Sequence, residues 1–179
     1  MHLIAALLDL CNQTKQPVIA IDGPAGAGKT TLAGNLAQAL SAKYAVRTLH
    51  LDDLYNGWDK ALTEELTHTL QQIISEHKNL SPLVISNYDW IASTFREPIT
   101  LESRELLILE GVGSGQSAIR EKLNALIWVD IDEEKGLSRV LERDGQQYES
   151  VMKKWLILQS EHFNRDSTQE NAEFILTNE

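Results

Sequence analysis

Apolar residues gather in short runs along the chain, and longer stretches of mixed polarity separate these runs. The runs are rich in valine, isoleucine and leucine, and the β-branched residues among them favour strands. They predict strands over residues 17–22, 45–52, 83–86, 105–111, 125–132 and 172–177. Because several runs are apolar throughout and do not alternate with polar residues, we expect strands that are buried on both faces.

The mixed stretches carry leucine and isoleucine three or four positions apart, which is the spacing of one helix face. This spacing predicts helices over residues 1–16, 32–40, 62–73, 114–122, 133–143 and 148–163. Strands that alternate with helices imply an α/β fold, a three-layer sandwich with a parallel sheet of about five strands and helices on both faces. We expect a single domain over residues 1–179.

The segment GPAGAGKT, residues 23–30, fits the pattern G-x-x-x-x-G-K-[ST] at every defined position, between a predicted strand and a predicted helix. Its glycines allow backbone N–H groups to turn toward phosphates, which predicts a P-loop NTPase fold that binds ATP. Lys29 is expected to reach the β and γ phosphates, and the Thr30 hydroxyl to bind Mg²⁺. Thr31 either touches a phosphate or only continues the helix. The expected nucleotide-binding residues are Gly23, Ala25, Gly26, Ala27, Gly28, Lys29, Thr30 and Thr31.

The composition favours a protein that acts on small molecules. A formal net charge of −10 argues against a nucleic-acid or anionic-membrane surface. No apolar run approaches the length of a membrane span. Cys11 is the single cysteine, which fits a reducing compartment. We therefore expect a cytoplasmic protein, monomer or homodimer, with a small-molecule substrate and no nucleic-acid or membrane partner.

Acidic residues stand at the ends of several predicted strands, where ligands of parallel sheets bind. Asp52 and Glu110 each follow an apolar run, so either carboxylate could accept a proton from a substrate hydroxyl or bind Mg²⁺. Asp52 could also only cap a turn, and Glu110 could only order the loop that follows it. Asp130 and Asp132 are better explained as caps of the next helix.

From residue 17 to residue 177 the chain resembles the uridine kinase-like P-loop kinases, which include uridine–cytidine, nicotinamide riboside, pantothenate and phosphoribulose kinases. The resemblance rests on motifs that occur in the family's order. After the P-loop, LDDLY resembles Q-D-[SD]-F-[YF], and NYDWIAST resembles Y-D-F-V-[ST]-H-S. LILEG then resembles L-x-x-E-G, and LSRVLERD resembles L-x-R-R-I-x-R-D.

This resemblance implies roles for individual residues. Asp52 falls on the family's catalytic base, and Glu110 falls on an acid beside the metal and the substrate. Lys29 and Arg143 would act on the phosphates, with Arg143 in a short lid at about residues 143–150. Metal ligation would fall to Thr30, Asp52 and Glu110. The acceptor would lie over Tyr55, Trp58, Tyr88, Asp89, Trp90, Arg96 and Glu110.

The chain also departs from the family's pattern. GQQYES replaces the longer E-R-G-R lid, so the additional lid arginines are missing. The ribose-binding F-D-H-P-D-A pattern is absent after Tyr55, and Ser93 stands where the family has its pocket histidine. Arg143 could instead form only surface ion pairs, and Trp58 could only cover the edge of the core.

These observations predict an ATP- and Mg²⁺-dependent kinase that phosphorylates a hydroxyl of a small metabolite, most simply a nucleoside. A nucleoside monophosphate or sugar-acid kinase is an alternative, although it would need arginines at the acceptor site. A regulatory module that binds ATP and hydrolyses it slowly is a second alternative, which the short lid favours.

Overall fold

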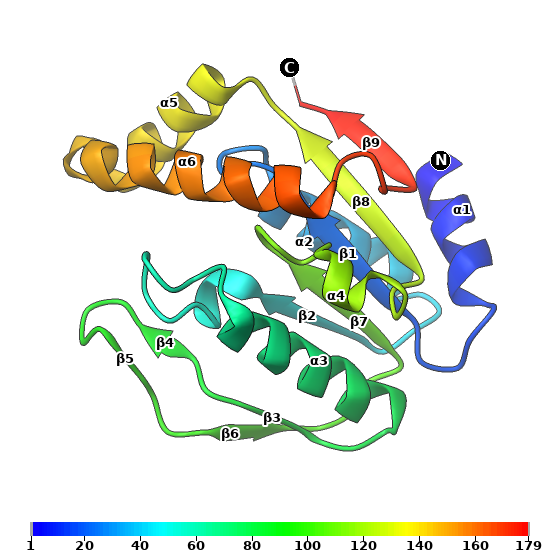
Figure 1. Ribbon diagram of the computed structural model, residues 1–179. Helices are drawn as coiled ribbons and strands as arrows, with labels where there is room; N and C mark the ends of the chain where they lie inside the picture. Colours follow the sequence, from blue (N-terminus) through cyan, green and yellow to red (C-terminus); the bar gives the residue numbers. More distant parts are fainter. Residues whose placement is uncertain (1, 179) are drawn as a thin grey trace.

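The protein, described here from a computed structural model, is placed over residues 2–178, with the backbone alone for His2. Five strands form one sheet in the order β2-β7-β1-β8-β9, and every neighbouring pair is parallel (Figure 1). These strands are β1 (Val18–Asp22), β2 (Val46–His50), β7 (Leu106–Glu110), β8 (Ala125–Asp130) and β9 (Phe174–Thr177). The predicted parallel sheet is therefore confirmed.

Helices cover both faces of this sheet, because successive strand residues point to opposite sides and both sides are apolar. Ile19 and Ile21 of β1 belong to one core cluster with Leu36, whereas Val18 belongs to a second cluster with Leu70. The first cluster includes residues of α1 (His2–Cys11) and α2 (Lys29–Leu40). The second includes residues of α3 (Glu64–Lys78), α4 (Ser117–Arg120), α5 (Glu133–Asp144) and α6 (Glu149–Asp166).

The carboxyl ends of the strands meet at one edge of the sheet, because neighbouring strands are parallel. β7 and β2 lie on one side of β1, and β8 and β9 lie on the other side. The predicted strand at 45–52 ends earlier, at His50, and a 3₁₀ turn, η1 (Leu51–Asp53), follows it. Leu51 is fully buried beneath this turn, and its carbonyl oxygen accepts from the Leu54 N–H at 2.8 Å. Asp52 therefore lies on a turn beyond the strand.

Residues 83–101 form an antiparallel arm beside α3 that leaves the main sheet (Figure 1). The predicted strand at 83–86 is present as β3 (Leu83–Ile85), but it pairs with β6 (Ile99–Leu101) and not with the central sheet. Further along the arm, β4 (Tyr88–Asp89) pairs with β5 (Thr94–Phe95). The sequence did not predict β4, β5 and β6, because two or three residues are too few to show a period.

The ends of α5 agree with the sequence pattern. Asp132 is its N-cap, and the Asp132 carboxylate accepts from the Lys135 N–H at 3.1 Å, as predicted. A short 3₁₀ helix, η2 (Gln146–Tyr148), joins α5 to α6 where the sequence predicted a lid. The predicted helix at 114–122 is shorter, since α4 spans Ser117–Arg120.

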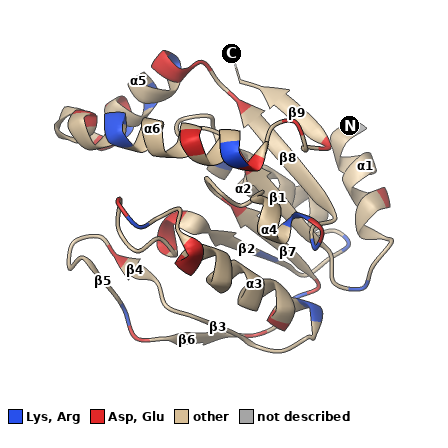
Figure 2. Cartoon of the chain, in the orientation of Figure 1, with Lys and Arg blue, Asp and Glu red and all other residues tan. Residues whose placement is uncertain are grey.

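Lysine and arginine residues are interleaved with acidic residues along the helices and loops (Figure 2). Within residues 2–178, none of the helices combines the length and the apolarity that a membrane crossing requires.

Candidate active site

The P-loop follows β1 and leads into α2. Gly26 and Gly28 have positive φ angles of 79° and 93°, which a residue with a Cβ adopts at a cost, and Gly28 is the N-cap of α2. Lys29 begins the helix and is 8% exposed. Its Nζ donates to the Pro24 carbonyl oxygen at 2.8 Å, so the ammonium folds back over the loop. This strand–loop–helix arrangement is the context that phosphate binding requires.

Three elements that are remote in sequence hold the P-loop in place. The Gln159 side chain of α6 accepts from the Ala25 N–H at 3.1 Å, and the Asn178 amide donates to the Ala27 carbonyl oxygen at 2.8 Å. The loop backbone also packs tightly against α5, because a Cβ added to Gly26 would lie 2.2 Å from the carbonyl oxygen of Gly136. The loop conformation is thus defined by tertiary contacts as well as by its own glycines.

Asp22, the last residue of β1, ties the P-loop to the loop after β7. Its buried carboxylate accepts from the N–H groups of Gly23, Gly113 and Gly115 at 2.8, 3.1 and 2.8 Å. Burial nevertheless raises the pKa of Asp22 to about 6, and the three N–H groups and the Lys29 ammonium oppose that rise.

Glu110 ends β7 directly below the start of α2. Thr30 Oγ1 lies 3.3 Å from each carboxylate oxygen of Glu110, and His50 Nδ1 lies 2.6 Å from Oε2. The hydrogen bond to Glu110 raises the pKa of the His50 imidazole above its ordinary value. A hydroxyl and a carboxylate are thereby held together at the beginning of the phosphate-binding helix.

Asp52 approaches the same region from η1. Its carbonyl oxygen accepts from Trp90 Nε1 at 3.1 Å, which attaches the antiparallel arm to the turn. The carboxylate lines a cavity, where desolvation by the surrounding protein raises the pKa of Asp52 while the Lys29 ammonium opposes the rise. Desolvation likewise lowers the pKa of Lys29, against the attraction of the Glu110, Asp22 and Asp52 carboxylates.

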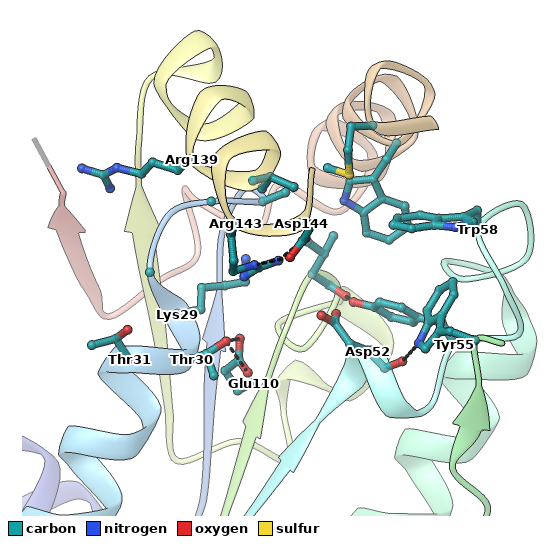
Figure 3. Close-up of a pocket in the computed structure, with 18 residues that line it drawn as sticks. Lys29, Thr30, Thr31, Asp52, Tyr55, Trp58, Glu110, Arg139, Arg143 and Asp144 are labelled. Atoms are coloured by element: carbon teal, nitrogen blue, oxygen red, sulfur yellow. Dashed lines mark hydrogen bonds and ion pairs between the residues drawn. The ribbon is translucent and has the colours of Figure 1, made fainter. Parts of the chain in front are cut away.

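A cavity of about 290 Å³ joins these groups (Figure 3). At one end it is lined by the P-loop with Lys29, Thr30 and Thr31, and at the other end by Tyr55 and Trp58. The Asp52 side chain lies between the two ends in this view. Because a ligand at either end would be within reach of Asp52, the cavity can bring two substrates to one carboxylate.

The α5 side of the cavity supplies arginines. Arg139 and Arg143 both line it, and Arg143 Nε and one of its terminal nitrogens each lie 2.7 Å from an oxygen of the Asp144 carboxylate. This paired contact raises the pKa of Arg143 above its ordinary value. The Arg143 side chain is 68% exposed, so the pair adds little to stability and leaves Arg143 able to turn toward a phosphate.

Residues 19–156 match the family described as an AAA domain (AAA_18), which is more than half of the chain. The chain belongs to this family. A uridine kinase of Lactobacillus helveticus is 26% identical over 160 residues, which cover 79% of this chain and 76% of that protein.

Solved structures give the same picture of this AAA-family fold. The structure of a possible uridine kinase from Bacillus stearothermophilus matches with a TM-score of 0.64 at 20% identity, over 98% of this chain and 100% of that chain. A D-glycerate 3-kinase of Cryptococcus neoformans matches with a TM-score of 0.68 at 12% identity, over 98% and 94%. The resemblance to uridine kinase-like proteins and the P-loop NTPase fold are thereby confirmed.

In this AAA domain, most of the residues expected at the site line one cavity. They are Ala25, Gly26, Gly28, Lys29, Thr30, Thr31, Asp52, Tyr55, Trp58, Glu110 and Arg143. Gly23 and Ala27 are buried residues of the P-loop and do not line the cavity.

Three residues expected around the acceptor lie elsewhere. Arg96 pairs with the Asp89 carboxylate at 2.9 Å on the outside of the arm, and the Asp89 carboxylate also accepts from the N–H groups of Ile91 and Ala92. Tyr88 packs its ring against Trp90 and does not line the cavity, whereas Trp90 does. The structure therefore brings only Trp90 of this segment to the site.

Several lining residues were not assigned to the site from the sequence. Val112, Met152, Trp155 and Asp144 line the cavity, and His50 contacts Glu110. Met152 and Trp155 carried no signal beyond the helical spacing of α6, since the same spacing occurs in any core-facing helix. His50 is two residues before Asp52, so its place at a strand end was the available sign.

Proposed function

We propose that this protein transfers the γ-phosphate of ATP to a hydroxyl group of a small metabolite, for which a nucleoside is the best candidate. The observation that carries this proposal is the place of Asp52, whose side chain faces the cavity between the P-loop end and the Tyr55–Trp58 end. The kinases among the similar proteins support the reaction class, and the uridine kinase relative supports the nucleoside.

In this mechanism the P-loop N–H groups and Lys29 hold the phosphates of ATP, and Asp52 accepts the proton of the acceptor hydroxyl. The raised pKa of Asp52 makes its carboxylate a better proton acceptor than an aspartate of ordinary pKa. Arg143 leaves Asp144 and neutralises charge on the phosphoryl group as it moves. Alignment and electrostatic stabilisation thus account for the catalysis.

The residues present fit a magnesium ion. Thr30 Oγ1 and the Glu110 carboxylate already lie 3.3 Å apart. Mg²⁺ prefers oxygen ligands, and it needs only a few of them from the protein when phosphates complete its coordination shell. Thr30 and Glu110 would hold the ion, with Asp52 beside them. When bound, Mg²⁺ supplies charge neutralisation on the phosphate oxygens.

An acceptor that itself carries a phosphate or carboxylate fits less well. Such acceptors need cations of their own, but the lysine and arginine side chains that line the cavity, Lys29, Arg139 and Arg143, come from the P-loop and α5. The Tyr55–Trp58 end is lined by aromatic and apolar residues. A neutral or weakly charged alcohol is therefore the better match.

The test is coupled ADP release against a panel of nucleosides, vitamin alcohols and sugars, with the Lys29→Ala variant as the blank. A signal that depends on one acceptor, and is absent in the variant, would support a kinase and identify its substrate. Slow ATP hydrolysis that no acceptor accelerates would refute the transfer function and favour a nucleotide-binding regulatory module.

A further inference from the structure

The end of the cavity opposite the P-loop is built from aromatic rings. Tyr55, Trp58, Trp90 and Trp155 line it, and we call these residues the aromatic wall. Three of the chain's four tryptophans therefore lie at one site. Tyr55 and Trp155 also belong to the core, and Trp58 packs against it, but Trp90 is 38% exposed, so filling the core does not account for the whole wall.

The rings of the wall touch one another across three separate segments. The ring centroids of Trp58 and Trp90 are 4.9 Å apart, those of Trp58 and Trp155 are 5.7 Å apart, and those of Tyr55 and Trp155 are 5.5 Å apart. Trp155 comes from α6, Trp90 from the antiparallel arm, and Tyr55 and Trp58 from the segment after η1. Since the tryptophan rings are already in contact, a ligand ring would lie on the wall and not between its members.

The polar atoms of the aromatic wall are poorly placed to recognise the hydrogen-bonding groups on the edge of a ligand ring. The Tyr55 hydroxyl donates to the Val112 carbonyl oxygen at 2.8 Å, and Trp90 Nε1 donates to the Asp52 carbonyl oxygen at 3.1 Å. The indole N–H groups of Trp58 and Trp155 can only donate. The one side-chain acceptor on the wall is the Tyr55 hydroxyl oxygen, and Tyr55 is only 2% exposed. A donor on a ligand ring, such as N3–H of uracil, would therefore find no accessible acceptor on the wall.

On the basis of the proposed kinase function, we infer that the aromatic wall selects the acceptor by the flat π-face of its ring and is indifferent to the ring's hydrogen-bonding edge. Trp58 and Trp90 are then the specificity-determining residues, because Trp155 is 6% exposed whereas Trp90 is 38% exposed. The ligand class is an alcohol that carries a planar heteroaromatic ring, with the hydroxyl directed at Asp52. Electron-poor rings are favoured, since indole faces are electron-rich.

Uridine and two of its analogues distinguish recognition of the ring's flat face from recognition of its hydrogen-bonding edge. N3-methyluridine keeps the flat ring but loses the N3–H donor, whereas 5,6-dihydrouridine keeps that edge but loses the flat aromatic ring. We expect N3-methyluridine to have a kcat/KM within about threefold of uridine, and dihydrouridine to lose on the order of tenfold or more, as the loss of one stacked base would cause. The opposite order would overturn the inference.

Variants of Trp90 test whether the aromatic wall causes the preference for uridine over dihydrouridine. Trp90→Leu should bring the uridine-to-dihydrouridine ratio of kcat/KM close to one, whereas Trp90→Phe, which keeps a ring, should retain most of it. Ile91→Ala is the matched control, because Ile91 is the next residue and is 99% exposed. Equal loss for both nucleosides in Trp90→Leu would mean that Trp90 has a structural role only, and would refute the assignment.

Binding separates the inference from the kinase proposal. Quenching of tryptophan fluorescence by the three nucleosides, measured with ADP and Mg²⁺ in a Trp128→Phe background, reports on the wall because Trp128 lies on β8 outside the cavity. Binding in the expected order without phosphorylation would support the wall and refute the kinase. Phosphorylation of uridine and dihydrouridine at equal rates would support the kinase and refute the role of the wall. Failure of all three nucleosides to bind would also overturn the inference.

Discussion

The backbones of Gly26 in the P-loop and Gly136 in α5 are packed directly against each other. A Cβ on Gly26 would lie 2.2 Å from the Gly136 carbonyl oxygen, and a Cβ on Gly136 would lie 2.7 Å from the Ala25 carbonyl oxygen. Both contacts are with main-chain atoms, so side-chain rotation cannot relieve them. The shape of the phosphate site therefore depends on the position of α5.

Gly136→Ala should displace the P-loop from α5. We expect weaker ATP binding and a free energy of unfolding lower by about 1–3 kcal/mol, the usual cost of overpacking. ATP titration by calorimetry and urea denaturation measure the two effects. Gly34→Ala in α2 is the control, because a Cβ there meets no atom within 4 Å and helix propensity should raise stability by up to about 1 kcal/mol. Unchanged ATP affinity in Gly136→Ala would show that the contact does not shape the site.

Asp52→Asn should remove the proposed proton acceptor while leaving the shape of the site unchanged. We expect kcat for phosphoryl transfer to fall by about 10²–10⁴-fold, with ATP affinity nearly unchanged. Steady-state kinetics at saturating acceptor measure the fall. The adjacent Asp53→Asn should keep most of the activity, because Asp53 does not line the cavity. Full turnover by Asp52→Asn would rule out its role as base.

Thr30→Val keeps the side-chain shape and removes the hydroxyl that faces Glu110. We expect the Mg²⁺ concentration for half-maximal activity to rise by about tenfold or more. A magnesium titration of ADP release measures this change. Thr31→Val should shift the titration far less, since Thr31 has no such contact with Glu110. An equal shift in both variants would contradict the assignment of Thr30 to the metal.

His77 gives the fold a pH dependence of its own. This residue of α3 is 1% exposed, its Nε2 donates to the Pro17 carbonyl oxygen at 3.1 Å, and burial lowers the imidazole's pKa below the ordinary value. Below about pH 6.5 the unfolded chain takes up a proton that the folded chain resists. Stability should therefore be lost as the pH falls below 6.5.

The His77→Gln variant should lose less stability than the wild type between pH 7.5 and pH 5. Urea denaturation at both pH values gives the difference for each protein. His68→Gln, on the exposed face of the same helix, should behave like the wild type. Identical pH dependence in His77→Gln and His68→Gln would exclude His77 as the source.

Long apolar runs made the central sheet predictable. The strand with LLILE is buried at every position, and so is the strand with VIAID before the P-loop, because helices cover both faces. The antiparallel arm could not be predicted, since β4 and β5 have two residues each and are held by pairing across the arm. Asp89 and Arg96 were assigned to an acceptor wall from sequence, but they bind each other outside it.

Short motifs located the phosphate end of the cavity better than its acceptor end. Lys29 and Thr30 are adjacent in sequence, so one motif places both of them. Trp58, Trp90 and Trp155 come from three segments that meet only in the folded chain. Their contacts are a property of the tertiary structure, which no local pattern contains.

The hydrogen bond from Asn178 to the Ala27 carbonyl oxygen joins residues 151 positions apart and has a consequence for biosynthesis. The P-loop leaves the ribosome early, but the residue that fastens it is made much later. At 5–20 residues per second, the delay is roughly 8–30 s. A nascent chain in that interval carries the motif without its final support. Tight nucleotide binding should therefore be acquired late in synthesis, after β9 has joined the edge of the sheet.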